Sequence, residues 1–278
     1  MTSKKGLLFG TAGIPISSKA LSTQAGIERI HELGLGCMEV EFVQGVSMSP
    51  QSARAAGEVA AERKISLSAH APYFINLNAR EPEKIAASRE RILQTARITS
   101  LLCGSSIVFH AAYYLKDPPS KVYATVKENL EQIVSRLRAE DNSIWVRPEI
   151  TGKGSQFGTL KEVLQLSAEI EGVAPAVDFA HLHARTGEVN SYDEFVTILE
   201  QIEGKLGRNA LDNMHIHVSG IEYGAKGESR HLLLAESDFR YVDLLRVLKD
   251  YGVGGILICE SPNREEDALL LQQTYRAL

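Results

Sequence analysis

The segment 65–77, which reads ISLSAHAPYFINL, shows the pattern that decides the fold. Its apolar part stops at His70, so it predicts a short buried strand that ends on a histidine. A proline and two aromatic residues, Tyr73 and Phe74, follow and predict a loop. The same design recurs along the chain, because later apolar runs also end on His, Asp or Glu.

Apolar runs of strand length alternate with stretches of helical period from end to end. The predicted strands are Gly6–Gly10, Cys37–Phe42, Ser66–Ala69, Ser106–His110, Ser143–Glu149, Ala174–Phe179, Asn213–Val218 and Gly254–Glu260. The helices between them are expected to begin near Ser22, Ser49, Glu81, Ser120, Thr159, Ser191 and Ser237, with a last helix over Arg264–Leu278. Eight such pairs predict an α/β fold, a single (β/α)8 TIM barrel that forms one domain over residues 1–278.

A doubly wound open sheet is the main alternative fold. It usually has fewer strands and a glycine-rich phosphate-binding fingerprint after the first one. The segment 10–13, GTAG, is too short for that fingerprint. The barrel is therefore the preferred interpretation.

Composition favours a soluble globular protein. The chain is 44% hydrophobic and 23% charged, and it has no apolar run of about 18 residues that could span a membrane. The apolar part of the amino terminus is only Leu7–Phe9, too short for a signal peptide, so we expect a cytoplasmic protein. The formal net charge of −5 argues against a general nucleic-acid binder. Cys37, Cys103 and Cys259 lie far apart and are expected to be small buried hydrophobic residues.

Metal-ligand residue types gather at the predicted strand ends, where TIM barrels place their catalytic groups. The candidates are His70, His110, Glu149, Asp178, His181, His217, His231 and Glu260. His215 is an alternative to His217, and His31 is the one histidine expected inside a helix. Imidazole and carboxylate together suit zinc, manganese or iron. Eight ligands exceed the needs of one ion, so we expect two or three, with zinc preferred and manganese as the alternative.

The charge of such a site indicates its substrate. Two or three divalent ions would outweigh the three carboxylates Glu149, Asp178 and Glu260. A cationic site of this kind suits a phosphate ester, because paired metal ions stabilise both the attacking and the leaving oxygen. Glu149 lies centrally in the set and could bridge two of the ions.

The same residues resemble the endonuclease IV family, zinc-dependent apurinic/apyrimidinic endonucleases that share their barrel superfamily with sugar isomerases. The matching segments are the histidine before PYFINL, FHAA, the Glu149 segment, VDFAH, IHVSG, Arg230-His231 and ESP, which together span about three quarters of the chain. The resemblance implies hydrolysis of double-stranded DNA on the 5′ side of abasic sites, by a protein that we expect to be a monomer and to have no membrane partner.

The resemblance also implies a set of ligands for each of three zinc ions. His70, His110 and Glu149 would hold the first; Glu149, Asp178, a seventh-strand histidine (His217 preferred) and Glu260 the second; His181 and His231 the third. Glu149 and Glu260 are the expected catalytic residues. Tyr73 and Phe74 match the family loop that inserts side chains into the DNA stack, which suits a base-free site.

Several features depart from the family pattern, among them the segment GTAGIPISS in place of the family's glycine-rich first loop. Ser229, with Glu228 beside it, stands where the family has an aspartate two residues before the third-site histidine, so the third ion is expected to be absent or weakly held. Basic residues near the expected barrel mouth are few: Arg80, Arg147, Lys153, Arg185, Lys226 and Arg230.

Two other functions compete with the repair nuclease. A single-metal isomerase or epimerase of a small sugar would suit the acidic second strand, which ends with Glu39 and Glu41, and the lack of a basic track for DNA. A barrel that kept the ligands but lost the chemistry is the third interpretation, prompted by Ser229. Metal content distinguishes the first two, since one manganese ion per chain would favour the isomerase.

Overall fold

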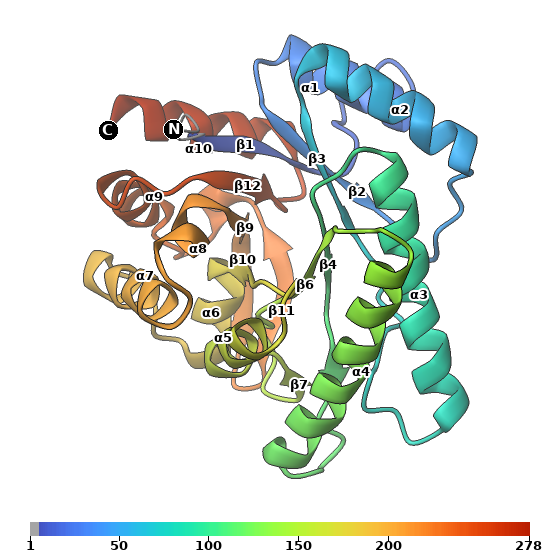
Figure 1. Cartoon of the computed structure of the whole chain (residues 1–278). Coiled ribbons are helices and arrows are strands. Elements are labelled where there is room, and N and C mark those ends of the chain that lie inside the picture. Colours follow the sequence, from blue (N-terminus) through green and yellow to red (C-terminus); the bar gives the residue numbers. More distant parts are fainter. Residues whose placement is uncertain (1–5) are drawn as a thin grey trace.

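Eight parallel strands form the centre of the molecule in the computed structural model, which describes residues 6–278 (Figure 1). They are β1 (Leu7–Ala12), β2 (Cys37–Glu41), β3 (Ser66–His70), β4 (Ser106–Phe109), β6 (Trp145–Pro148), β8 (Ala176–Asp178), β9 (Met214–Val218) and β12 (Gly255–Cys259). Their order in the sheet is β6-β4-β3-β2-β1-β12-β9-β8. The two edges meet through parallel bridges at Val146–Val173 and Glu149–Ala176, which confirms the predicted TIM barrel.

Helices surround the strands, as the alternating pattern predicted (Figure 1). They are α1 (Thr23–Glu32), α2 (Pro50–Arg63), α3 (Pro82–Leu101), α4 (Pro119–Ala139), α5 (Leu160–Glu169), α6 (Phe179–Thr186), α7 (Tyr192–Leu206), α8 (Arg208–Asp212), α9 (Tyr241–Asp250) and α10 (Glu265–Ala277), with a short 3-10 helix at Leu234–Glu236. None of the described helices is long and apolar enough to cross a membrane.

Local sequence signals explain most helix starts. Ser22 and Ser49 each accept a hydrogen bond from a backbone N–H of the first helical turn, of α1 and α2 respectively. Thr159 and Glu162 form a reciprocal capping box at the start of α5. Proline occupies the first turn of α2, α3 and α4, where its missing N–H costs nothing.

The end of one predicted strand, the start of one predicted helix and the predicted burial of one cysteine are wrong. The sixth strand ends at Asp178 rather than Phe179, because the Asp178 carboxylate caps α6 by accepting the His181 N–H at 2.7 Å. Helix α9 begins at Tyr241, since the Ser237 hydroxyl instead accepts the N–H groups of Ile221 and Phe239 in the preceding loop. Cys103 is exposed because it lies in the turn after α3, although Cys37 and Cys259 are buried as expected.

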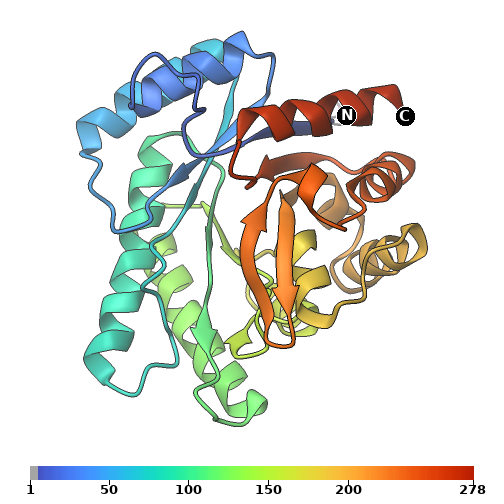
Figure 2. The same ribbon diagram turned by 180° about the vertical axis from the view of Figure 1, so that it is seen from behind.

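Two small antiparallel sheets were not predicted. One pairs β5 (Ala112–Tyr113) with β7 (Gln156–Phe157), which lie in different loops, and the other is a hairpin of β10 (Gly220–Gly224) and β11 (Gly227–Leu232). Figure 2 shows this hairpin, coloured orange, standing in front of the strands. Both small sheets lie in loops that follow barrel strands, so they extend the end of the barrel that holds the strands' carboxyl ends.

The barrel interior is divided into an apolar part and a polar part. Cys37, Ile256 and Ile258 fill one part with partly buried Leu8 and Ala12. The other part holds buried polar side chains beneath the strand ends: Glu39, Ser68, Ser106, Arg147 and His215. TIM barrels usually fill this space with branched apolar residues, so the polar part indicates a specialised role.

Candidate metal centre

All eight predicted ligand residues lie at the carboxyl end of the barrel, together with carboxylates that the sequence interpretation did not select. The donor atoms form three neighbouring groups, and Glu39, His215 and His217 form a fourth group deeper in the barrel; within each group the atoms lie within 4.8 Å of one another. We name the three neighbouring groups site 1 (His70, His110, Glu149), site 2 (Glu149, Asp178, His217, Glu260) and site 3 (His181, Glu228, His231). Glu149 belongs to both site 1 and site 2.

Site 1 brings two imidazoles to one carboxylate oxygen. His70 Nε2 and His110 Nε2 lie 3.1 Å and 3.0 Å from Glu149 Oε2. His70 ends β3, while His110 and Glu149 directly follow β4 and β6. The other ring nitrogen of His70 lies 2.8 Å from the Ala71 carbonyl and donates to it, so Nε2 presents its lone pair to the site.

Site 2 contains His217, whose Nδ1 lies 3.3 Å from Glu149 Oε1 and 3.4 Å from Glu260 Oε1. His215 lies deeper in the barrel and is not part of this group: its Nδ1 pairs with the Ser106 hydroxyl at 3.0 Å. The structure thus places His217 rather than His215 beside the carboxylates. Asp178 Oδ2 is buried and accepts no hydrogen bond within the described residues, although His181 Nδ1 lies 3.2 Å from it, and such an oxygen suits a metal ligand.

Site 3 gains its carboxylate from Glu228. His181 Nε2 lies 3.4 Å from both Glu228 Oε2 and His231 Nε2. The Nδ1 atoms of the two histidines face the carbonyls of Ile150 and Glu260, at 3.1 Å and 3.3 Å, so both Nε2 atoms point at the site. Two imidazole nitrogens that face each other need a shared proton or cation, because their lone pairs repel.

A β-bulge explains why Glu228 replaces the family aspartate. In β11, Arg230 pairs with Glu222 and Glu228 pairs with Tyr223, so Ser229 is an extra residue. Positions three apart in a regular strand face opposite sides, but one inserted residue brings Glu228 to the same side as His231. Site 3 therefore has a carboxylate donor despite Ser229, and the expectation that its ion is absent or weakly held stays a prediction.

The spacing of the donors fits zinc. Ligands placed tetrahedrally at 2.0–2.1 Å from a zinc ion are about 3.3 Å apart. The closest donor pairs in sites 1 to 3 are 3.0–3.4 Å apart, and they combine imidazole with carboxylate as zinc and manganese sites do. The residues present thus fit a group of two or three such ions.

The protonation of the pocket reflects burial and its crowded charges. Burial raises the pKa of Glu260 to about 8, with help from Glu149 and Asp178 and against the effect of His217. Burial alone would lower the pKa of His70, but its hydrogen bond to Glu149 and nearby carboxylates raise it to about 10. Protons therefore balance the carboxylates in the absence of ions, and divalent cations would replace those protons.

Two glutamates of β2 were missed as parts of the site. Glu39 is fully buried, and its oxygens lie 2.9 Å from His217 Nε2 and 3.0 Å from His215 Nε2. Burial raises the pKa of Glu41 to about 7, while the nearby His70 opposes that rise. The signal that could have revealed both was present in the sequence: alternate residues of a strand share one face, so CMEVE directs two acids into the barrel.

The mouth above the sites holds the predicted aromatic residues. A cavity of about 250 Å³ is lined by Tyr73, Lys153 and residues of all three sites, and it adjoins a larger cavity of about 780 Å³ that shares Tyr73 and Glu260. The Tyr73 ring lies 5.5 Å from that of His70 and is 53% exposed. Phe74 is 64% exposed and lies outside the lining of both cavities.

Few of the basic residues expected near the mouth are free to meet a substrate. Arg80 pairs with Asp117, and Arg230 pairs with Glu222. Arg185 donates to backbone carbonyls of the loop after β6. The placement of Arg147 near this mouth is wrong, because Arg147 points into the barrel two residues before Glu149 and lies towards the opposite end.

The fold agrees with the comparisons with known proteins. The chain belongs to the xylose isomerase-like TIM barrel family, which it matches over residues 27–278. It is 45% identical over 273 residues to an uncharacterized protein of Methanocaldococcus jannaschii, covering 98% of each chain. It is 25% identical over 209 residues to a probable endonuclease 4 of Mycoplasma pneumoniae, covering 72% of this chain and 69% of that protein.

Solved structures with the same fold include an endonuclease and an epimerase-like protein. Endonuclease IV from Thermus thermophilus superposes with a TM-score of 0.73 at 19% identity, covering 96% of this chain and 98% of that one. A D-tagatose 3-epimerase-like protein also gives 0.73 at 19% identity, covering 96% of both chains. At these identities the likeness extends to the fold alone.

Proposed function

We propose that this protein is a zinc-dependent phosphodiesterase of the endonuclease IV type, which cleaves double-stranded DNA on the 5′ side of abasic sites. The observation that carries the proposal is the set of three donor groups around one cavity, with Glu149 common to sites 1 and 2. The curated relatives named probable endonuclease 4 support it.

The charge balance supports an anionic substrate. Three divalent ions would outweigh the four carboxylates of the sites: Glu149, Asp178, Glu228 and Glu260. The chemistry that bound zinc supplies at such a site is polarisation of the phosphoryl group, a lowered pKa of water and stabilisation of the leaving oxygen. A phosphodiester is therefore the substrate class that matches the site.

The protein's own residues would position the reaction. Glu149 belongs to both site 1 and site 2, so it would fix the distance between these two sites, where the phosphate would bind. Glu260 lines both cavities at the mouth and would face the attacking side or the leaving side of the phosphate. Exposed Tyr73 and Phe74 would fill the gap left by a missing base, since aromatic rings stack on neighbouring bases.

A nicking assay tests the proposal. Zinc-loaded protein should cut a duplex that contains one synthetic abasic site, and the cut should lie on its 5′ side. Glu149→Gln should lower the rate by at least a hundredfold, because it weakens two metal sites at once, while the exposed Glu222→Gln serves as the matched control. Zinc-loaded protein that leaves abasic DNA intact would overturn the proposal.

A single-metal sugar isomerase or epimerase is the second candidate. Site 2 alone has four ligands, enough for one ion, and half-buried Glu41 lines the adjoining cavity as an additional acid or base. The epimerase-like neighbour has the same fold. Elemental analysis distinguishes the two candidate functions. One manganese ion per chain supports the epimerase, and two or more zinc ions per chain support the nuclease. His231→Asn should abolish nicking but spare an epimerase that uses site 2.

A further inference from the structure

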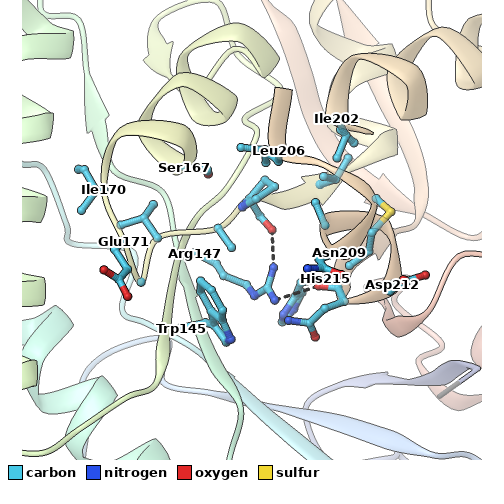
Figure 3. A pocket seen from close by; sticks show the side chains of 18 residues that line it. Trp145, Arg147, Ser167, Ile170, Glu171, Ile202, Leu206, Asn209, Asp212 and His215 are labelled. Carbon is cyan, nitrogen blue, oxygen red and sulfur yellow. Dashed lines mark hydrogen bonds between the residues drawn. The ribbon is translucent and has the colours of Figure 1, made fainter. Parts of the chain in front are cut away.

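A third cavity lies at the opposite end of the barrel from the metal centre, beside the amino ends of β6, β8 and β9. Figure 3 shows the side chains that line it. Its volume is about 480 Å³, and pockets for small molecules typically measure about 300–1,000 Å³. Most of the wall is apolar, with Ile170, Val173, Val177, Ile202 and Leu206 among its residues. An apolar cavity of this size is typical of a small-molecule site.

Arg147 provides this cavity with a buried positive charge. Its side chain is only 3% exposed, and it donates from Nη1 to the Pro175 carbonyl at 2.8 Å and from Nη2 to the Asn213 carbonyl at 3.0 Å (Figure 3). A guanidinium has five N–H donors, and Nε has no acceptor within the described residues. No ion pair of the described residues neutralises Arg147, so the protein leaves a buried cation without a contacting anion.

Nearby acids do not supply the missing partner. The Asp212 carboxylate pairs with Arg208 at 3.1 Å, and the Glu171 carboxylate points away from Arg147 (Figure 3). Glu39 lies deeper in the barrel, where it contacts His215 and His217. An anion that enters the cavity would therefore find the guanidinium available.

Trp145 adds an aromatic surface near the cation. It is 39% exposed, lines the cavity, and its ring centroid lies 5.9 Å from Arg147 Cζ. A planar apolar group could stack on this ring while its anionic end reaches inward to the guanidinium.

We propose that this cavity binds a small amphipathic anion, whose carboxylate or phosphate group pairs with Arg147 and whose apolar body lies between Trp145 and the aliphatic wall. The carboxylate and the phosphate share the chemistry that a guanidinium recognises, namely two oxygens that accept neighbouring N–H groups. The inference is independent of the metal centre, since none of the cavity's lining residues belongs to sites 1 to 3.

The chain offers an internal reporter for this site, because Trp145 is its only tryptophan. The probe is 8-anilinonaphthalene-1-sulfonate, an aromatic anion that accepts energy from tryptophan. We expect saturable energy transfer from Trp145 with one probe per chain. Phenylacetate and phenyl phosphate should displace the probe at least tenfold better than neutral 2-phenylethanol, and their relative strength decides between carboxylate and phosphate.

Variants locate the binding. Arg147→Met should weaken probe binding at least tenfold, and Arg147→Lys should weaken it less, because lysine keeps the charge but lacks the planar fork. Ala210→Leu should narrow the cavity while leaving Arg147 in place, and it should also weaken probe binding. It therefore tests the proposal even if the arginine variants do not fold. Arg246→Met on α9 is the control. Unchanged probe affinity in folded Arg147→Met or in Ala210→Leu, or equal displacement by 2-phenylethanol, would overturn the proposal.

Discussion

At the scale of single residues, the buried contact between Glu39 and His217 is the least expected feature of the metal centre. His217 directs Nδ1 to Glu149 and Glu260 and directs Nε2 to Glu39 at 2.9 Å. A carboxylate behind a ligand histidine fixes the tautomer and orientation of the ring and raises its basicity. The Ser68 hydroxyl donates a hydrogen bond of 2.7 Å to the other Glu39 oxygen, so the carboxylate is itself oriented.

Replacing Glu39 should therefore weaken metal binding without removing a ligand. For Glu39→Gln we expect a loss of about 10–100-fold in zinc affinity, the usual effect of losing a partner behind a ligand. Competition with a chromophoric chelator measures this affinity. Glu222→Gln, which changes an exposed acid, is the control. Equal affinity in Glu39→Gln and the unaltered protein would show that Glu39 does not orient His217.

At the scale of elements, the bulge in β11 decides whether site 3 exists. Ser229 is the extra residue that turns Glu228 towards His181 and His231. Gly152 allows the strand to approach, because a Cβ there would lie 2.7 Å from the Cβ of Glu228. The site thus depends on hairpin geometry as much as on residue type.

Deleting Ser229 should leave the ion of site 3 in place. The deletion puts Glu228 two residues before His231 in a strand without the bulge, so the two side chains still share one face and the metal content should not change. Ser229→Ala keeps the bulge and is the matched control. Elemental analysis of the two variants gives the answer, and a loss of one ion per chain in the deletion variant would contradict this role of the bulge.

Some helices and strands could be predicted from the sequence and others could not. The helices after Ser22, Ser49 and Thr159 begin where their capping residues predicted, since a cap acts within one turn. Helix α6 was missed because it follows β8 without a loop, and Asp178 serves at once as strand end, helix cap and member of site 2. The two small antiparallel sheets were missed because their pairing joins segments that carry no strong local pattern.

At the scale of the whole molecule, the metal centre is a concentration of buried like charges. Sites 1 to 3 place Glu149, Asp178, Glu228 and Glu260 around one cavity. Carboxylates this close repel one another unless cations or protons lie between them. The folded chain should therefore be more stable with ions bound than without them.

Metal removal should lower the thermal stability. An ion that binds only the folded state adds about 2.7 kcal/mol at a free concentration of 100 times its Kd, and several ions add more. We expect the Tm of the zinc-loaded protein to fall by several degrees after chelation and to recover with zinc but not with magnesium. Calorimetry measures the change, and identical transitions before and after chelation would contradict a structural contribution from the ions.

The sequence by itself determined the barrel and the residues at its strand ends. The alternation of apolar runs and helical periods is local, and parallel strands in a barrel bring their carboxyl ends to one rim, so His70 and Glu149 could be placed together. Only the tertiary structure decided the rest: the partner of His217, the side on which Glu228 faces, and the cavity around Arg147. These depend on register and on contacts between distant strands, where a shift of one residue reverses the facing of a side chain.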